Sequence, residues 1–228
     1  MDTVSAPGWM CPARALGDDH GVLLENSPTD RPPVARLATW PAAVLVGTAV
    51  GALTSPAQTL LGDTVLSGLT NAVGPWLLAP FALGARARST RAAVLVGVLS
   101  CVAQVAGYYA VSAARGFAVY APTVAEWVVA GVVGGAVLGV AGRSWWTATG
   151  RWQGLGAALL VAAWLAEGIG VFGLLLGYAG SAVVSCVVGV ALAVGLGRHG
   201  RQHRALLGWL LPALAAGALG FGVLLAVL

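Results

Sequence analysis

Seven apolar runs, each about as long as a bilayer is thick, constrain the fold of this chain more than any other feature of its sequence. A membrane-spanning helix needs about 20 mostly apolar residues, and in hydrocarbon it satisfies its own backbone hydrogen bonds. Charged residues make up 9% of the chain, against about a quarter in soluble domains. The sequence therefore predicts an all-α, polytopic transmembrane helix bundle with spans at residues 37–54, 64–85, 92–112, 123–141, 154–176, 181–197 and 205–228.

The first 36 residues differ in composition from the rest, because prolines and carboxylates crowd them. Residues 1–36 are predicted to form a disordered cytoplasmic tail, and residues 37–228 a transmembrane helical domain. The tail lacks the basic start and the short apolar core of a signal peptide. We therefore expect the chain to enter the membrane through its first span.

All twelve basic side chains are arginines, and eleven of them fall on one side of the predicted bundle. With the N-terminus in the cytoplasm, only Arg115 lies outside, and the opposite orientation would invert this ratio. The positive-inside rule therefore predicts a cytoplasmic N-terminus. The arginines on the cytoplasmic side are Arg14, Arg31, Arg36, Arg86, Arg88, Arg91, Arg143, Arg151, Arg198, Arg201 and Arg204.

Neither a metal site, a cofactor nor a catalytic centre is predicted. Cys11, Cys101 and Cys186 are few and scattered. His199 and His203 lie among arginines in "RHGRQHR" without a third ligand, which favours a basic anchor over a metal site, with contact to anionic lipid as its functional form. The H-E-x-x-H, P-loop and G-x-S-x-G motifs are absent from the sequence, so nothing in it supports an intramembrane enzyme. The arginines follow the ends of apolar runs rather than one face, so no nucleic-acid partner is expected.

Small residues recur at four-residue spacing on two of the predicted helices. Such faces let helix backbones approach closely, and close packing is a main source of helix association in lipid. Packing inside the bundle is one interpretation of them, and docking of another membrane subunit through the face on the first span is the other. The residues are Ala43, Gly47 and Gly51 on the first span, and Gly131, Gly135 and Gly139 on the fourth.

The second span contains helix-breaking residues. Pro75 and Pro80 each remove one helical hydrogen bond, at the carbonyls of Asn71 and Trp76. A freed carbonyl in hydrocarbon needs a partner in the protein, so the span is predicted to kink toward the bundle interior. The kink is either purely structural or lines a cavity.

Three polar side chains share one depth in the predicted membrane. Asn71, Gln104 and Glu167 lie roughly 10 to 13 Å below the outer ends of their spans. Burying Glu167 in the membrane costs more free energy than burying either of the other two. An ionisable residue at such depth is by default a candidate for a functional site. Trp164 shares the helix face of Glu167, and Tyr108 that of Gln104. The layer predicts either a small-molecule pocket or a set of ties between helices.

Further polar and aromatic residues lie nearer the outer surface: Gln58, Asp63, Tyr109, Arg115, Tyr120, Glu126 and Trp127. With the polar layer, they predict a pocket that opens to the outside. For Tyr109, Tyr120 and Trp127, an interfacial aromatic belt is the alternative.

The segments "GALTSPAQTLLGD", "LTNAVGPWLLAPFALGARARSTRAA" and "GYYAVSA" resemble, in that order, an uncharacterised family of actinobacterial multipass membrane proteins, known as a domain of unknown function. The resemblance covers mainly residues 51–115 and implies no activity. The chain is also loosely similar to the substrate-binding subunits of vitamin-uptake transporters, with Ala43, Gly47 and Gly51 as the small-residue face. It departs from them by a seventh span.

The sequence thus predicts a multi-pass protein of a bacterial inner membrane that binds or transports a small molecule from the outer side. Its partners would be the lipid bilayer, a small-molecule ligand and a membrane subunit at the first span. A non-transporting interaction or structural subunit is the alternative. The predicted ligand-binding residues are Asn71, Trp76, Gln104, Tyr108, Trp164 and Glu167.

Overall fold

The computed structural model describes residues 40–227, and within that range it contains helices and no strand. The predicted all-α helix bundle is confirmed. The predicted tail at residues 1–36 and the first three residues of the first predicted span lie outside the described residues.

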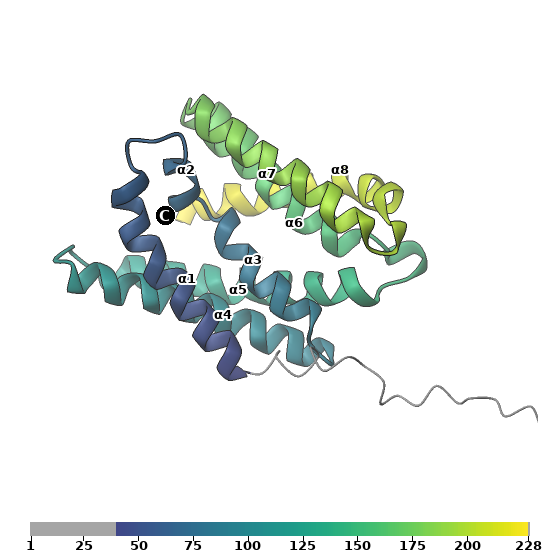
Figure 1. Cartoon of the computed structure of the whole chain (residues 1–228), viewed down its shortest axis with the longest axis horizontal. Coiled ribbons are helices and arrows are strands. Elements are labelled where there is room, and N and C mark those ends of the chain that lie inside the picture. Colours follow the sequence, from purple (N-terminus) through teal and green to yellow (C-terminus); the bar gives the residue numbers. More distant parts are fainter. Residues whose placement is uncertain (1–39, 228) are drawn as a thin grey trace, which may run out of the picture. The chain divides into compact units, whose positions relative to one another are not determined.

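Six helical segments are long and apolar enough to cross a membrane, which indicates a multi-pass membrane protein. They are α1, α4, α5, α7, α8 and the segment formed by α6 with its π-helical continuation η3 (Figure 1). The helices run as follows: α1 Trp40–Leu61, α2 Ser67–Thr70, α3 Gly74–Ala85, α4 Thr90–Ala114, α5 Ala121–Thr147, α6 Leu155–Ala166, η3 Glu167–Leu175, α7 Ala179–Arg198 and α8 His203–Val227.

The second predicted span is not one kinked helix, and this part of the prediction is wrong. The chain forms the four-residue helix α2, leaves the helical conformation at residues 71–73, and resumes as the 12-residue helix α3 (Figure 1). Pro75 lies in the first turn of α3, where its missing N–H breaks no helical hydrogen bond. A break upstream of the proline therefore replaces the expected kink, while Pro80 stays inside α3.

Small residues bring the helix backbones together inside the bundle. Ala43, Gly47 and Gly51 are buried, and a Cβ atom added to Gly51 would lie only 2.8 Å from the Cα atom of Gln104 on α4. On α5, a Cβ added to Gly139 would lie 3.0 Å from the carbonyl carbon of Ala93 on α4. These contacts account for both small-residue faces within the chain, and a subunit docking on the α1 face would have to displace α4.

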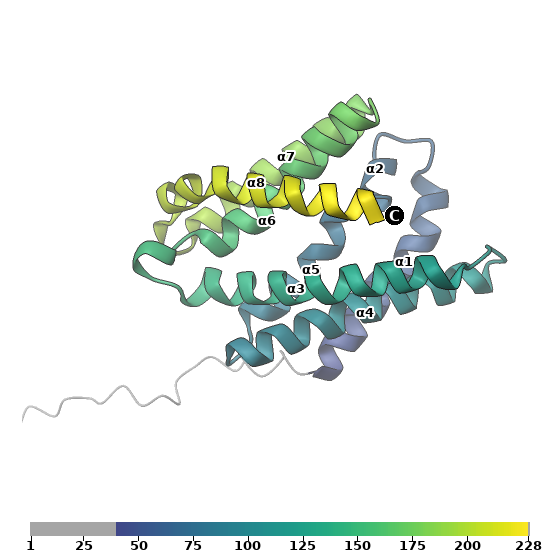
Figure 2. The same cartoon turned by 180° about the vertical axis from the view of Figure 1, so that it is seen from behind.

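The helix directions agree with a chain that crosses the membrane back and forth. Helices α1 and α4 run the same way, since Gly47 contacts Ser100 while Ser55 bonds to Ser112 further along both helices. The segment from α2 to α3 therefore returns the chain between them. Helices α6 and α8 also run the same way, with α7 between them in sequence, and Figure 2 shows α8 beside α6.

The predicted orientation can be tested at two exposed loop residues, Ala118 before α5 and Thr149 after it. In a cysteine-free background, Ala118→Cys should react with a membrane-impermeant maleimide on intact cells. Thr149→Cys should react only after the cells are permeabilised, because the cytoplasmic arginines Arg143 and Arg151 flank it. The reverse pattern would invert the topology.

The close backbone contact at Gly139 yields a stability prediction. Gly139→Ala should lower the thermal midpoint of the detergent-solubilised protein, because overpacking a tight contact typically costs about 1–3 kcal/mol. Gly195→Ala on α7 is the matched control, since a Cβ there meets no atom within 4 Å. Equal midpoints for the two variants would contradict the packing described for α4 and α5.

Candidate functional site

A cavity of about 200 Å³ lies beside the break between α2 and α3. Its lining comes from α1, the break, α3, α4 and the start of α5, so several helices converge on one non-helical stretch. The lining combines amides, hydroxyls and aromatic rings and includes no charged side chain. The residues are Thr54, Gln58, Thr70, Asn71, Ala72, Val73, Trp76, Tyr108, Tyr109 and Trp127.

A chain of hydrogen bonds crosses this site and holds the break to α1 and α4. The Tyr108 hydroxyl donates to Oε1 of Gln58 at 3.0 Å. Nε2 of Gln58 donates to Oδ1 of Asn71 at 2.9 Å and to the carbonyl of Thr70 at 3.2 Å. Nδ2 of Asn71 donates to the carbonyl of Ser67 at 3.0 Å. Gln58 thus supplies the partner that the backbone at the break needs in a membrane.

Aromatic rings form the rest of the wall. The rings of Trp76 and Tyr108 meet edge to face with centroids 5.9 Å apart, and those of Tyr108 and Tyr109 do so at 5.0 Å. Such arrangements place the positive edge of one ring against the negative face of the next. Trp127 on α5 completes the aromatic part of the lining.

Glu167 binds the break from the side of α6. Its carboxylate oxygens accept the N–H groups of Val73 at 2.6 Å and Gly74 at 2.8 Å. The donors are the N-cap residue Val73 and the first residue of α3, Gly74, at a helix end where backbone N–H groups lack helical partners and the helix dipole is positive. Glu167 is 3% exposed. A carboxylate at this position therefore stabilises a helix end that starts inside the protein.

Gly74 permits this contact. A Cβ atom there would lie 2.8 Å from the Trp164 ring and 3.1 Å from an Oε atom of Glu167. Glu167 also marks a change in its own helix, because α6 ends at Ala166 and the wider π-helical turns of η3 begin at Glu167. Local widening of this kind occurs often at functional sites.

The structure divides the six predicted ligand-binding residues into two groups and one separate residue, Gln104. Asn71, Trp76 and Tyr108 line the cavity. Glu167 and Trp164 lie behind the break, in contact with Gly74. Gln104 is fully buried and donates to Sγ of Cys101 at 3.9 Å, with its backbone against Gly51 of α1. A ligand in the cavity would thus contact the first group directly and the second only through the break.

Sequence reasoning missed four of the lining positions as site residues: Thr54, Thr70, Ala72 and Val73. Nothing in the sequence separates these from other small or apolar positions. Gln58, Tyr109 and Trp127 were expected nearer the outer surface, and the two aromatic residues line the cavity rather than serving only as a belt. Tyr120 is 69% exposed, as an interfacial residue would be.

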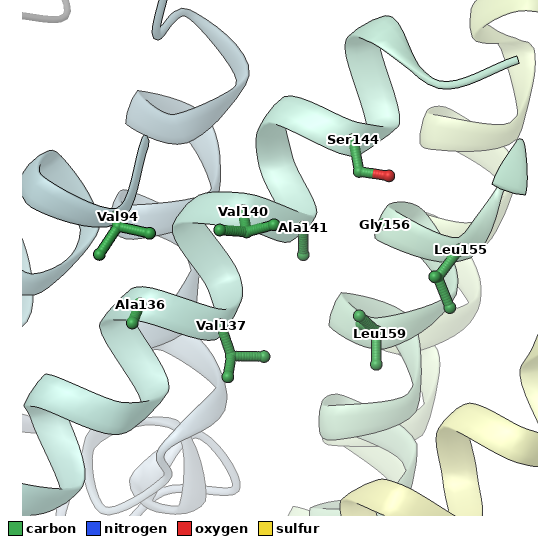
Figure 3. A pocket seen from close by; sticks show the side chains of 9 residues that line it. All are labelled: Val94, Ala136, Val137, Val140, Ala141, Ser144, Leu155, Gly156 and Leu159. Carbon is green, nitrogen blue, oxygen red and sulfur yellow. The ribbon is translucent and has the colours of Figure 1, made fainter. Parts of the chain in front are cut away.

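A second, larger hollow of about 400 Å³ lies between α5 and α6. Figure 3 shows Val137 and Ser144 on α5 opposite Leu155 and Leu159 on α6. Ser144 supplies its single polar side chain, so this groove suits an acyl chain of the surrounding lipid better than a polar ligand. Among the described residues, no three His, Cys, Asp or Glu side chains gather as a metal site would require.

Residues 28–228 match the model of a protein family described as a family of unknown function, DUF6518. The chain belongs to this family. No curated protein and no solved structure is detectably similar to the chain. Membership in DUF6518 agrees with the resemblance to an uncharacterised family noted above and assigns no activity to the cavity.

The contact between Glu167 and α3 leads to a prediction about stability. Glu167→Ala should lower the thermal midpoint sharply, because it leaves two backbone N–H groups without acceptors, at about 1–3 kcal/mol for each buried donor. Glu167→Gln should fall between this variant and the wild type, since its amide keeps one acceptor oxygen. Glu126→Ala, on half-buried α5 surface, is the control. A wild-type midpoint for Glu167→Ala would show that the α3 end needs no carboxylate.

Proposed function

We propose that this protein binds a small molecule in the cavity at the break, or transports it, from the outer side of a bacterial inner membrane. The observation that carries the proposal is the convergence of polar and aromatic side chains on a non-helical stretch between two helices. Non-helical backbone at membrane depth is tolerated where it lines a cavity or is buried in protein.

The composition of the lining supports binding over a purely structural role. Small-molecule sites are mostly apolar, with a few placed polar groups that orient the ligand, and here Gln58, Asn71 and Tyr108 are held in place by one hydrogen-bonded chain. A tie between helices would need no cavity beside it. In the predicted orientation, the cavity lies toward the outer ends of α1 and α4.

The break between α2 and α3 is also a feature that favours transport. A half-helix that starts at membrane depth offers backbone groups to a substrate, and broken helices of this kind line the sites of many secondary transporters. The finer expectations, which are an actinobacterial source and likeness to vitamin-uptake subunits, remain proposals here. A non-transporting interaction subunit is the competing function, and we propose no enzymatic reaction for either.

Native mass spectrometry of the protein extracted gently from its own membrane tests the proposal. We expect a small molecule to co-purify with the wild type and to be lost in Thr54→Phe. Thr54 is a lining residue whose hydroxyl bonds only within its own helix, so the larger ring fills the cavity without breaking the α1–α4 contacts. Val46→Phe on an exposed face of α1 is the control.

Loss of the bound molecule from Thr54→Phe alone would support the cavity as its site. Equal amounts of the bound molecule in the wild type and in Thr54→Phe would show that it binds outside this cavity. A wild-type protein that carries only a partner subunit would favour the interaction function instead.

A further inference from the structure

We propose that the ligand of this cavity is a small organic cation, such as a quaternary or protonated amine. This inference rests on the proposed binding function and adds the chemical class of the ligand. Three independent features of the site support it: the direction of its hydrogen bonds, its aromatic wall, and the charge behind the break.

Three hydroxyls and one amide of the lining use their donors within the protein. The hydroxyls of Thr54 and Thr70 donate to the carbonyls of Val50 and Ser67, within their own chain segments. The Tyr108 hydroxyl donates to Gln58, whose amide donates twice at the break. These four groups therefore keep oxygen lone pairs, rather than N–H or O–H groups, for a ligand, and lone pairs favour a positively charged ligand over an anion.

The aromatic wall favours the same charge. The faces of Trp and Tyr rings carry negative electrostatic potential, and a cation within about 6 Å of a ring centroid is attracted to it. Trp76, Tyr108, Tyr109 and Trp127 reach the cavity from three helices, and no basic side chain joins them. Arg115, which the predicted topology places on the outer side, instead donates to Ser55 and Thr59 of α1.

The charge behind the break has the matching sign. Val73 lines the cavity, and its N–H group bonds to Glu167. The N-terminus of a helix carries about half a positive elementary charge, whereas a carboxylate carries a full negative one. With Glu167 ionised, its negative charge exceeds the partial positive charge of the helix end behind Val73, in a medium where charges are weakly screened. The volume of about 200 Å³ is below that of pockets for drug-sized ligands, so the cation is small.

Choline and its uncharged isostere 3,3-dimethylbutan-1-ol separate charge from shape. In isothermal titration calorimetry on the full-length protein in nanodiscs, choline should bind at least about tenfold more tightly, since desolvated cation–π contacts are worth about 2 kcal/mol or more. Trp76→Leu and Trp127→Leu, which keep an apolar side chain but remove the π face, should each weaken choline binding roughly 3- to 30-fold. Trp146→Leu, at an exposed ring outside the cavity, should not.

The outcomes separate the proposed ligand class from the proposed binding function. Equal affinity for the two probes, or wild-type choline affinity in both leucine variants, overturns the cationic class. Failure of choline to bind also overturns it, and in that case a co-purifying molecule displaced by Thr54→Phe would leave the binding function standing. If nothing binds and nothing co-purifies, both proposals fall.

Discussion

The bond between Glu167 and the N-terminus of α3 is the interaction on which the rest of the site depends. A helix that begins inside a membrane protein exposes backbone N–H groups where water is scarce, and each needs an acceptor. Glu167 supplies two acceptor oxygens from another helix. Because the carboxylate holds the break from one side, residues 71–73 can form the wall of a cavity on the other.

Close backbone packing makes this arrangement rigid enough to be a site. Helices α1, α4 and α5 meet through glycines and alanines at distances that larger residues would not permit. Since lipid provides no hydrophobic drive for helix association, such contacts and buried hydrogen bonds are the main sources of stability. Gln58 on α1 bonds to Tyr108 on α4, and Gly47 and Gly51 set the separation of these two helices. The small-residue faces thus position the hydrogen-bonded side chains that line the cavity.

The groove between α5 and α6 and the cavity at the break differ in the ligands that they can recognise. The groove between α5 and α6 is larger, but it has almost nothing to orient a polar ligand. The cavity at the break is half the volume and combines hydrogen-bonded amides, hydroxyl oxygens and aromatic rings. Specific binding follows from placed polar groups rather than from volume, which is why the smaller cavity is the better candidate.

The sequence by itself determined that the chain is a helical membrane protein and where most of its spans lie, because the length and apolarity of a run suffice to predict a membrane helix. It also singled out Asn71, Glu167 and the prolines of the second span, because polar and helix-breaking residues are costly in hydrocarbon. Only the tertiary structure decided that this span is broken, that Glu167 caps α3 while Gln104 packs away from the cavity, and that Tyr109 and Trp127 join Trp76. These outcomes depend on how helices far apart in sequence rotate and approach one another, and no local pattern carries that information.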